Sequence, residues 1–495
     1  MSASNGRIGL PITAAAPGSL SRRDLFQRMA GGFYGSALAA LLLDESGVRP
    51  ALASGAPLLD LRARPTHMPA RAKSVIHLFM NGGPSQMDLF DPKVELDKNH
   101  GKSYFEKIAG EVENPQAAGA LMKSPFQFAQ HGKCGAWVSD ALPHLTRHVD
   151  DLAFIRSLYT TNLTHEPALY LIQSGRMNPG SPSLGAWVVY ALGSENRNLP
   201  AYVVLDDPQG LPINGVQNWT SGLLPPQFQG TRFRSTGMPV LSLKPETEQP
   251  EETFTLEREL VARLDHIHQR ARPLYPQLEA RMESYRLAAR MQLQATDALD
   301  LAQESPATLE RYGIGKGASD SYGRRCLMAR RLVERGVRFV QLYIRGQIWD
   351  HHGGLLDGVR SCAAQTDQPI AALLQDLKER GLLDETLVVW GGEFGRLPIA
   401  QMAADKDERK AGRDHNKNAM CGWMAGGGVR GGVTFGETDE IGLAAAKDRV
   451  SVPDWHATIL HLLGLRHDRV VYDSHGLPEK LTGQEPARVI REILA

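Results

Sequence analysis

The sequence predicts an α/β fold in which a buried sheet is covered by helices on both faces. Five apolar segments have the length and composition of buried strands, and amphipathic helical segments lie between them. Continuous apolar strands are typical of mostly parallel sheets that are covered on both sides. Polar and glycine-rich sequence follows nearly every strand, at the edge where open α/β sheets bind ligands. The expected strands cover residues 75–80, 151–160, 199–207, 335–346 and 385–396.

Helical segments follow two of these strands. In TTNLTHEPALYLIQSGR, residues 160–176, Asn162 or Thr164 can cap a helix that begins near His165 and that Gly175 ends. QPIAALLQDLKERGLL, residues 368–383, predicts a second helix before the last strand. The glycine-rich stretch 424–437 predicts a hairpin near the site.

The N-terminal segment predicts export from the cytoplasm. Arg22 and Arg23 precede a moderately apolar run at 29–43, which is too short to span a bilayer comfortably. Small residues then offer a cleavage position after about Ala53. The pattern resembles a twin-arginine signal, so we expect the export machinery as a partner, a periplasmic or secreted location and no stable transmembrane segment in the mature protein.

The chain is expected to have one main domain. We predict a signal peptide at 1–53, a linker at 54–72 and a catalytic-type domain at 73–490. Residues of about 250–304 form a charged segment with helical spacing of its leucines, which predicts a helical insertion. The 55 basic and 55 acidic residues balance, which argues against nucleic acid as a partner. The four cysteines are widely spaced and form no CxxC pattern.

Four polar clusters follow predicted strands or precede a helix. Carboxylates mixed with imidazoles suit a divalent cation, because they combine negative charge with borderline-soft nitrogen. Such residues also cap helices and form turns, so only their gathering at one sheet favours a shared metal site. The clusters are WDHHGG with Asp350, His351 and His352, GGEFGR with Glu393 and Arg396, GRDHN with Arg413, Asp414 and His415, and VPDWH with Asp454 and His456.

The order of these clusters resembles the alkaline phosphatase, sulfatase and cofactor-independent phosphoglycerate mutase superfamily, over most of residues 74–466. The combination FMNGGPSQMDLFDPK, WDHHGG, GGEFGR and GRDHN is similar to the bacterial family called domain of unknown function 1501. The resemblance implies an alkaline-phosphatase-like three-layer sandwich with a mostly parallel central sheet and a helical insertion. It also implies a divalent metal, with zinc, manganese, magnesium and calcium as candidates.

The superfamily pattern places Asn81 and His165 at two important positions. Asn81 stands where the first strand usually ends in a metal-binding Asp, so charge there would have to come from Asp88, one turn further on. His165 stands ten residues before Gly175, at the place of the superfamily's nucleophile. Because His165 is neither Cys nor Ser, a formylglycine sulfatase is disfavoured.

Three roles for His165 stay open at this point. Neutral imidazole is a competent nucleophile, and a helix N-terminus would lower its pKa and hold an anion. Alternatively, His165 ligates the metal or contacts the transition state, or it is a turn histidine bonded to the backbone. Thr161 and Thr164 are hydroxyl nucleophiles nearby, each less well placed.

The later clusters match the superfamily in part. Asp350 and His352 carry over, whereas the usual Asp-His-Gly appears as Glu393-Phe394-Gly395 and loses its imidazole. Arg396 and Arg413 are either anion clamps or structural ion pairs. The predicted metal ligands are Asp88, Asp350, His352, Glu393, Asp414, His415 and His456, the predicted catalytic residues are His165, Arg396 and Arg413, and Asn81 and His351 are further site residues.

Two functions from different classes agree with this pattern. The first is an exported metal-dependent hydrolase of phosphate or sulfate esters, with a small anionic ester or a sulfated or phosphorylated glycan as substrate. The second is a non-catalytic descendant of the fold that binds an anion, a glycan or a partner protein. No feature supports a purely structural envelope protein.

Overall fold

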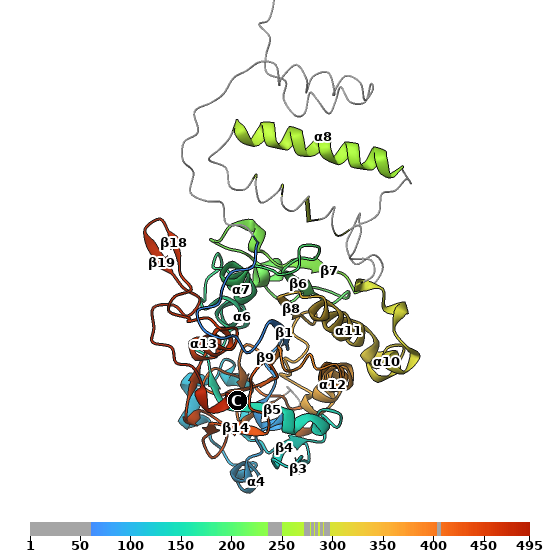
Figure 1. Cartoon of the computed structure of the whole chain (residues 1–495). Helices are drawn as coiled ribbons and strands as arrows, with labels where there is room; N and C mark the ends of the chain where they lie inside the picture. Colours follow the sequence, from blue (N-terminus) through green and yellow to red (C-terminus); the bar gives the residue numbers. More distant parts are fainter. Residues whose placement is uncertain are drawn as a thin grey trace, which may run out of the picture. The chain divides into compact units, whose positions relative to one another are not determined.

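A computed structural model describes residues 61–235, 250–271, 298–402 and 407–495, together with positions 278, 282, 286, 287 and 291. The expected signal peptide lies outside these residues, so the boundaries at 53, 72 and 490 stay predictions. The chain divides into two compact units, of which one contains helix α8 (Glu251–Arg270) and the other contains all the remaining described elements (Figure 1). Within the described residues, no helix combines the length and the apolar character needed to cross a membrane.

A nine-stranded sheet forms the centre of the second unit. All of its pairings are parallel except those of β13, which runs antiparallel to both β5 and β9. In spatial order the strands are β14 (Val433–Phe435), β5 (Leu152–Tyr159), β13 (Met420–Ala425), β9 (Thr386–Gly391), β1 (Ser74–Phe79), β8 (Phe339–Leu342), β6 (Tyr202–Leu205) and β7 (Thr231–Phe233), and β17 (Val450–Ser451) also pairs with β5.

Helices cover both faces of this sheet (Figure 1). On β1, Ile76 and Leu78 belong to the core shared with α11 (Asp320–Glu334) and α12 (Leu355–Glu379). Val75 and Phe79 point the other way, because side chains alternate along a strand. They belong to a second core with α6 (His165–Ser174), α7 (Leu184–Leu192) and α13 (Val452–Leu462). The predicted α/β class, with a mostly parallel sheet between two helical layers, is therefore confirmed.

Smaller elements surround the sheet. The helices are α3 (Gln86–Leu89), α4 (Val94–Asn99), α5 (Phe105–Ile108) and α10 (Pro306–Arg311), and the two-stranded pairs are β3 (Phe128–His131) with β4 (Ala136–Ser139), β2 (Ala118–Leu121) with β11 (Ile399–Gln401), β10 (Gly395–Arg396) with β12 (His415–Asn416), β15 (Glu437–Thr438) with β16 (Ala445–Lys447), and β18 (Tyr472–Ser474) with β19 (Leu477–Glu479). All four cysteines are free thiols.

One local expectation was wrong, and one predicted helix exists but begins earlier than expected. The stretch 424–437 forms no hairpin, because β13 and β14 do not pair with each other and instead flank β5 on opposite sides. The helix expected at 368–383 begins much earlier, at Leu355, and contains Pro369. Leu355, Val359 and Cys362 are buried and continue the apolar stripe toward the N-terminus at helical spacing, so packing extends the helix past the proline.

Helix α6 ends at Gly175, as the sequence indicates, and this end is tightly packed. Gly175 has a φ of 73°, and a Cβ at this position would lie 1.9 Å from the carbonyl oxygen of Leu481. At the other end, Thr164 is the N-cap but makes no side-chain cap bond, while Oδ1 of Asn162 accepts the N–H of Thr164. The close packing at Gly175 fixes the helix that carries His165.

We expect Gly175→Ala to destabilise the protein by more than about 2 kcal/mol, because the substitution combines a left-handed backbone with a steric clash. Gly315→Ala is the matched control, since Gly315 has a φ of 82° but open space where the Cβ would lie. The control should cost about 1 kcal/mol. Equilibrium denaturation of both variants measures the difference, and equal losses would contradict the packing argument.

Candidate metal centre

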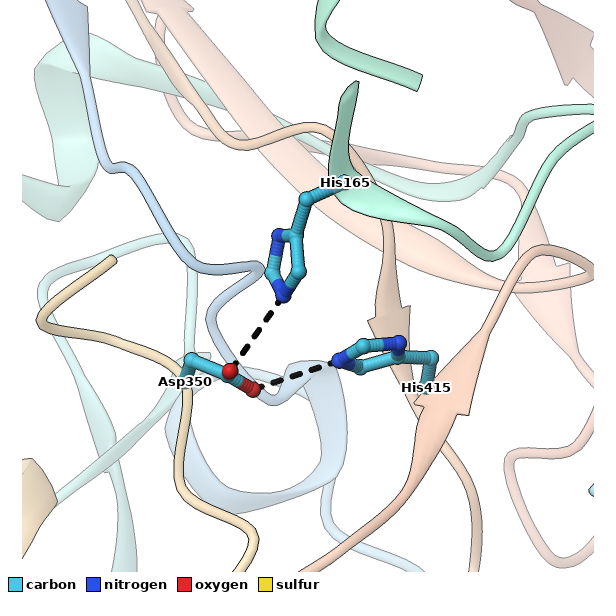
Figure 2. A group of neighbouring side chains, drawn as sticks. All are labelled: His165, Asp350 and His415. Atoms are coloured by element: carbon cyan, nitrogen blue, oxygen red, sulfur yellow. Dashed lines mark hydrogen bonds and ion pairs between the residues drawn. The ribbon is translucent and has the colours of Figure 1, made fainter. Parts of the chain in front are cut away.

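Three side chains from distant parts of the chain converge at the carboxyl edge of the sheet (Figure 2). His165 is the first residue of α6, which follows β5, and Asp350 lies in the loop after β8. His415, in β12, comes before β13 rather than after a strand. Because β13 is antiparallel to its neighbours, its beginning lies at the edge where β5 and β9 end. One potential ligand atom from each of these residues lies within 4.8 Å of the other two.

The Asp350 carboxylate is the centre of the cluster. Its Oδ2 lies 3.3 Å from Nε2 of His165, and its Oδ1 lies 3.2 Å from Nε2 of His415. Nε2 of His352 lies 3.0 Å from the same Oδ1. Three imidazoles therefore direct their Nε2 atoms at one carboxylate, as Figure 2 shows for two of them.

Each of these imidazoles has a side-chain oxygen close to its other nitrogen. Nδ1 of His165 hydrogen bonds to Oε1 of Glu393 at 2.6 Å, and Nδ1 of His352 hydrogen bonds to Oε1 of Gln401 at 2.5 Å. Nδ1 of His415 lies 2.6 Å from Oε2 of Glu113 but makes no hydrogen bond in this geometry. For His165 and His352, the acceptor at Nδ1 fixes the proton there and leaves Nε2 as the lone-pair atom, which is the arrangement typical of metal-binding histidines.

The charges at the centre set its pKa values. Burial alone would lower the pKa of His165, but hydrogen bonds to Asp350 and Glu393 outweigh it and raise that pKa to about 9. Burial would raise the pKa of Asp350, yet the bonds from the three imidazoles hold it far below its usual range. Burial lowers the pKa of His415, whereas the hydrogen bond to Asp350 raises that of His352. Without a cation, the proton at the centre is therefore held mainly by His165.

Arg396 is a structural partner of Asp350. Its Nη2 donates to Oδ1 of Asp350 at 2.7 Å, while its Nε donates to the carbonyl of Gly83 at 2.8 Å and its Nη1 to that of Arg413 at 3.1 Å. Nη2 also donates to the carbonyl of Gly82. Most N–H groups of Arg396 therefore donate to other groups of the protein, and few remain to bind an anionic substrate.

Asp88 and Arg413, expected at the metal and at the substrate, pair with each other instead. Nε and Nη2 of Arg413 donate to the two Asp88 oxygens at 2.7 and 3.2 Å, and both side chains are completely buried. Ser85 donates a further hydrogen bond to Asp88. Asp88 and Arg413 satisfy each other in this bidentate pair, so neither residue belongs to the proposed metal centre.

Two of the predicted histidines also lie outside the cluster. His456 is buried, its Nε2 is 2.8 Å from the carbonyl oxygen of Ile172, and burial lowers its pKa to about 4. Nε2 of His351 faces Sγ of Cys362 at 3.7 Å, and burial together with the charge of Arg396 lowers its pKa to about 4. Neither imidazole forms a hydrogen bond or an ion pair with Asp350.

The remaining predicted residues border the cluster. Oδ2 of Asp414 accepts the N–H groups of Glu113 and Asn114 at 3.0 and 2.9 Å, so it holds the loop that supplies Glu113. Asp414, Glu113 and His415 form a second group of potential ligands. Nδ2 of Asn81 donates to the carbonyl of Ile344 at 2.5 Å, while its Oδ1 is buried without a hydrogen-bond partner.

Glu113 and Gln401, which lie at Nδ1 of His415 and His352, were not predicted from the sequence. Glu113 precedes a short 3-10 turn at 115–117 and Gln401 ends β11, and no motif surrounds either residue. In the superfamily pattern, Phe394 stands only for the loss of an imidazole. Its ring lies 4.7 Å from that of His165 and 4.4 Å from that of His415, and these two imidazoles lie 4.5 Å apart, so Phe394 packs against both.

The raised pKa of His165 makes the metal-free protein more stable at low pH. Protonated His165 contributes its full stabilisation below its unfolded pKa near 6.5, and the contribution is lost as the pH rises toward 9. We therefore expect the stability advantage of the wild type over His165→Gln to fall by about 3 kcal/mol between pH 6 and 9.

Denaturation of chelator-treated protein at several pH values measures this slope. Glu393→Gln should make the slope shallower, since it removes one of the two carboxylates that bond His165. A pH-independent difference between the wild type and His165→Gln would contradict the assignment.

Several solved structures are similar to this chain. A sulfatase from Pseudoalteromonas sp. is 12% identical, with 87% of this chain and 71% of that chain covered and a TM-score of 0.35. The lipoteichoic acid synthase LtaP from Listeria monocytogenes is 9% identical, with 86% and 79% covered and a TM-score of 0.34. A phosphonate monoester hydrolase from Silicibacter pomeroyi is 11% identical, with 85% and 76% covered and a TM-score of 0.32. A search of curated proteins found no match.

The family model described as protein of unknown function (DUF1501) matches residues 72–494. This range includes the whole central sheet and every residue of the candidate metal centre. The chain therefore belongs to the DUF1501 family.

Proposed function

We propose that the protein is an exported metal-dependent hydrolase of phosphate or sulfate esters. One observation carries the proposal: three imidazoles direct Nε2 at Asp350, while Glu393 and Gln401 hold Nδ1 of His165 and His352 by hydrogen bonds and Glu113 lies beside Nδ1 of His415. Outer partners of this kind orient histidines for a metal. Ion pairs at the protein surface do not require additional contacts that fix the orientation of each imidazole through Nδ1.

The donor set fits a divalent cation. Nε2 of His165 is buried and has only the 3.3 Å ion-pair contact with Asp350, which lacks hydrogen-bond geometry, and Oε2 of Glu393 is buried without a hydrogen-bond partner. Burying unsatisfied polar atoms costs about 1–3 kcal/mol each, and a cation would remove this cost. Imidazole nitrogen together with carboxylate oxygen favours zinc or manganese over purely oxygen-preferring ions. The proposed ligands are His165, Asp350, His352 and His415.

A cation in this position would supply Lewis acidity and neutralise part of the negative charge of an ester. The residues of the chain prepare the site for it. Glu393 keeps the proton of neutral His165 on Nδ1, and Arg396 keeps Asp350 ionised and in place. The first N–H groups of α6 lie beside His165 and favour an anionic group there. His165 therefore acts as a ligand, and no hydroxyl or thiol nucleophile of the chain is required.

A second candidate function is metal-dependent binding without turnover. The internal bonds of Arg396 and Arg413 favour it, because neither guanidinium is left as a clamp for a phosphate or sulfate group. One measurement distinguishes the two functions: the rate at which the metal-loaded protein hydrolyses esters.

Elemental mass spectrometry of protein purified from the periplasm tests the metal centre. We expect near-stoichiometric transition metal in the wild type and loss of most of it in Asp350→Asn and in His415→Ala, since each variant removes a ligand. His351→Gln is the matched control, because His351 is next to His352 in sequence but faces Cys362. Wild-type protein that binds no divalent cation would overturn the proposal.

If the centre binds metal, p-nitrophenyl phosphate and p-nitrophenyl sulfate distinguish hydrolysis from binding. Turnover that disappears with Asp350→Asn and persists in His351→Gln supports the hydrolase. Stoichiometric metal without turnover of a wider panel of phosphate and sulfate esters supports the binding function.

The hydrogen bond between Gln401 and Nδ1 of His352 gives an independent prediction. Gln401→Ala leaves every proposed ligand in place but removes the acceptor at Nδ1 of His352. We expect the affinity for metal to fall about 10-fold to 100-fold, as for other outer partners. Competition with a chromophoric chelator measures the change. Unaltered affinity would show that His352 is not a ligand.

A further inference from the structure

A second group of potential metal ligands lies at Nδ1 of His415. One ligand atom from each of Glu113, Asp414 and His415 lies within 4.8 Å of the other two. Nε2 of His415 faces Oδ1 of Asp350 at 3.2 Å, whereas its Nδ1 lies 2.6 Å from Oε2 of Glu113. The ring therefore directs one nitrogen at the carboxylate of the metal centre and the other at a separate pair of carboxylates.

The hydrogen bond to Asp350 leaves Nδ1 of His415 as an acceptor without a donor. A carboxylate only accepts hydrogen bonds, so Nε2 is the donor in this bond, and in neutral imidazole the other nitrogen carries a lone pair. The His415 side chain is 5% exposed, and its Nδ1 is buried without a hydrogen-bond partner. A buried lone pair beside a carboxylate oxygen indicates a cation as their common partner.

The two carboxylates of this group also lack a basic partner. In the parts of the chain that the structure describes, neither Glu113 nor Asp414 pairs with a lysine or arginine. Asp414 is buried and accepts only backbone N–H groups, that of His415 at 2.9 Å and those of Glu113 and Asn114 at 3.0 and 2.9 Å. Its one ion-pair contact, with Nδ1 of His352, is as long as 4.0 Å. Because an uncompensated buried carboxylate is costly, a cation here would be stabilising.

The loop that carries Glu113 is held in place on both sides of this residue. Val112 is buried in a small hydrophobic core that includes Leu397. Glu111 pairs with Lys417 at 3.0 Å. The Glu113 side chain itself is 38% exposed, so a cation can reach the group from solvent. The ligands are therefore brought together by the fold and do not depend on a cation for their position.

We propose that Glu113, Asp414 and His415 form a second cation site, which the His415 ring joins to the metal centre. Two carboxylates and one imidazole suit manganese, and water can complete its coordination on the exposed side. When both cations are bound, the His415 ring has no N–H, and its proton passes to solvent. The second site itself is independent of the proposed function, whereas the joining of two cations rests on the metal centre proposed above.

The second site should hold its cation more weakly than the centre. It offers one imidazole where the centre offers three, and one of its carboxylates is partly exposed. We therefore expect its cation to be lost during purification and to return when manganese is added.

Manganese titration tests the site, with the full chain after removal of metal by a chelator. The electron paramagnetic resonance signal of free aqueous Mn²⁺ gives the number of ions bound. We expect two ions per chain in the wild type and one in Glu113→Ala, which loses a ligand of the second site. Glu111→Ala is the matched control, because Glu111 is two residues away but pairs with Lys417, and it should keep both ions.

Asp350→Asn separates this proposal from that of the metal centre. This variant should lose the ion of the centre and keep the ion of the second site, and Asp350→Asn combined with Glu113→Ala should bind none. If the centre binds no metal, the wild type and Asp350→Asn should each bind one ion, and Glu113→Ala should still remove it.

Equal numbers of bound ions in the wild type and Glu113→Ala would overturn the second site. A lower affinity with an unchanged number of ions would also overturn it, because Glu113 would then only orient His415. The joining of the two cations has its own readout. Two manganese ions bound to one imidazole ring couple magnetically, so the signal of bound manganese should be broader in the doubly loaded wild type than in Glu113→Ala. Signals of equal width would show that His415 does not join the two ions.

Discussion

The fixed position of the Asp350 carboxylate is the constraint on which the whole centre depends. Arg396 neutralises it from one side and three imidazoles approach it from the others. The backbone at Asp350 also packs directly on the turn after β1. A Cβ on Gly82 would lie 2.5 Å from the N of Asp350, and Gly82 has a φ of 112°, so only glycine permits this approach.

The close contact between Gly82 and the backbone of Asp350 explains how the uncharged Asn-Gly-Gly turn at 81–83 contributes to the centre. Asn81 and Gly82 hold the loop of Asp350, and the N–H of Gly82 donates to Glu393 at 2.9 Å. Glu393 in turn orients His165. The end of the first strand therefore sets the geometry of residues from β8, β9 and α6 together. Burial of so many charged groups is tolerated because each is paired or awaits a cation.

Much of the architecture could be predicted from the sequence, because buried strands and helix ends leave clear local signals. The strands near 75–80, 151–160 and 385–396 and the end of α6 at Gly175 follow from composition and spacing. The role of β13 could not be predicted in the same way, since its direction depends on pairing with β5 and β9. Motifs likewise drew attention to Asp88 and Arg413, but a chain pattern does not reveal that two such residues neutralise each other. Glu113 and Gln401 meet His415 and His352 only in the folded structure, and no motif in the sequence around them indicates these contacts.

The central position of β13 has a consequence for the order of folding. Gly422 pairs with Ile155 on one side and with Gly391 on the other, so the sheet cannot close around β5 until β13 has been synthesised. Such distant pairings carry a large loop-closure entropy and slow the search for the native state. His415 lies immediately before β13, so it joins the centre late in synthesis. A nascent chain therefore lacks a complete centre until His415 has left the ribosome, and metal binding at the centre can only follow that point.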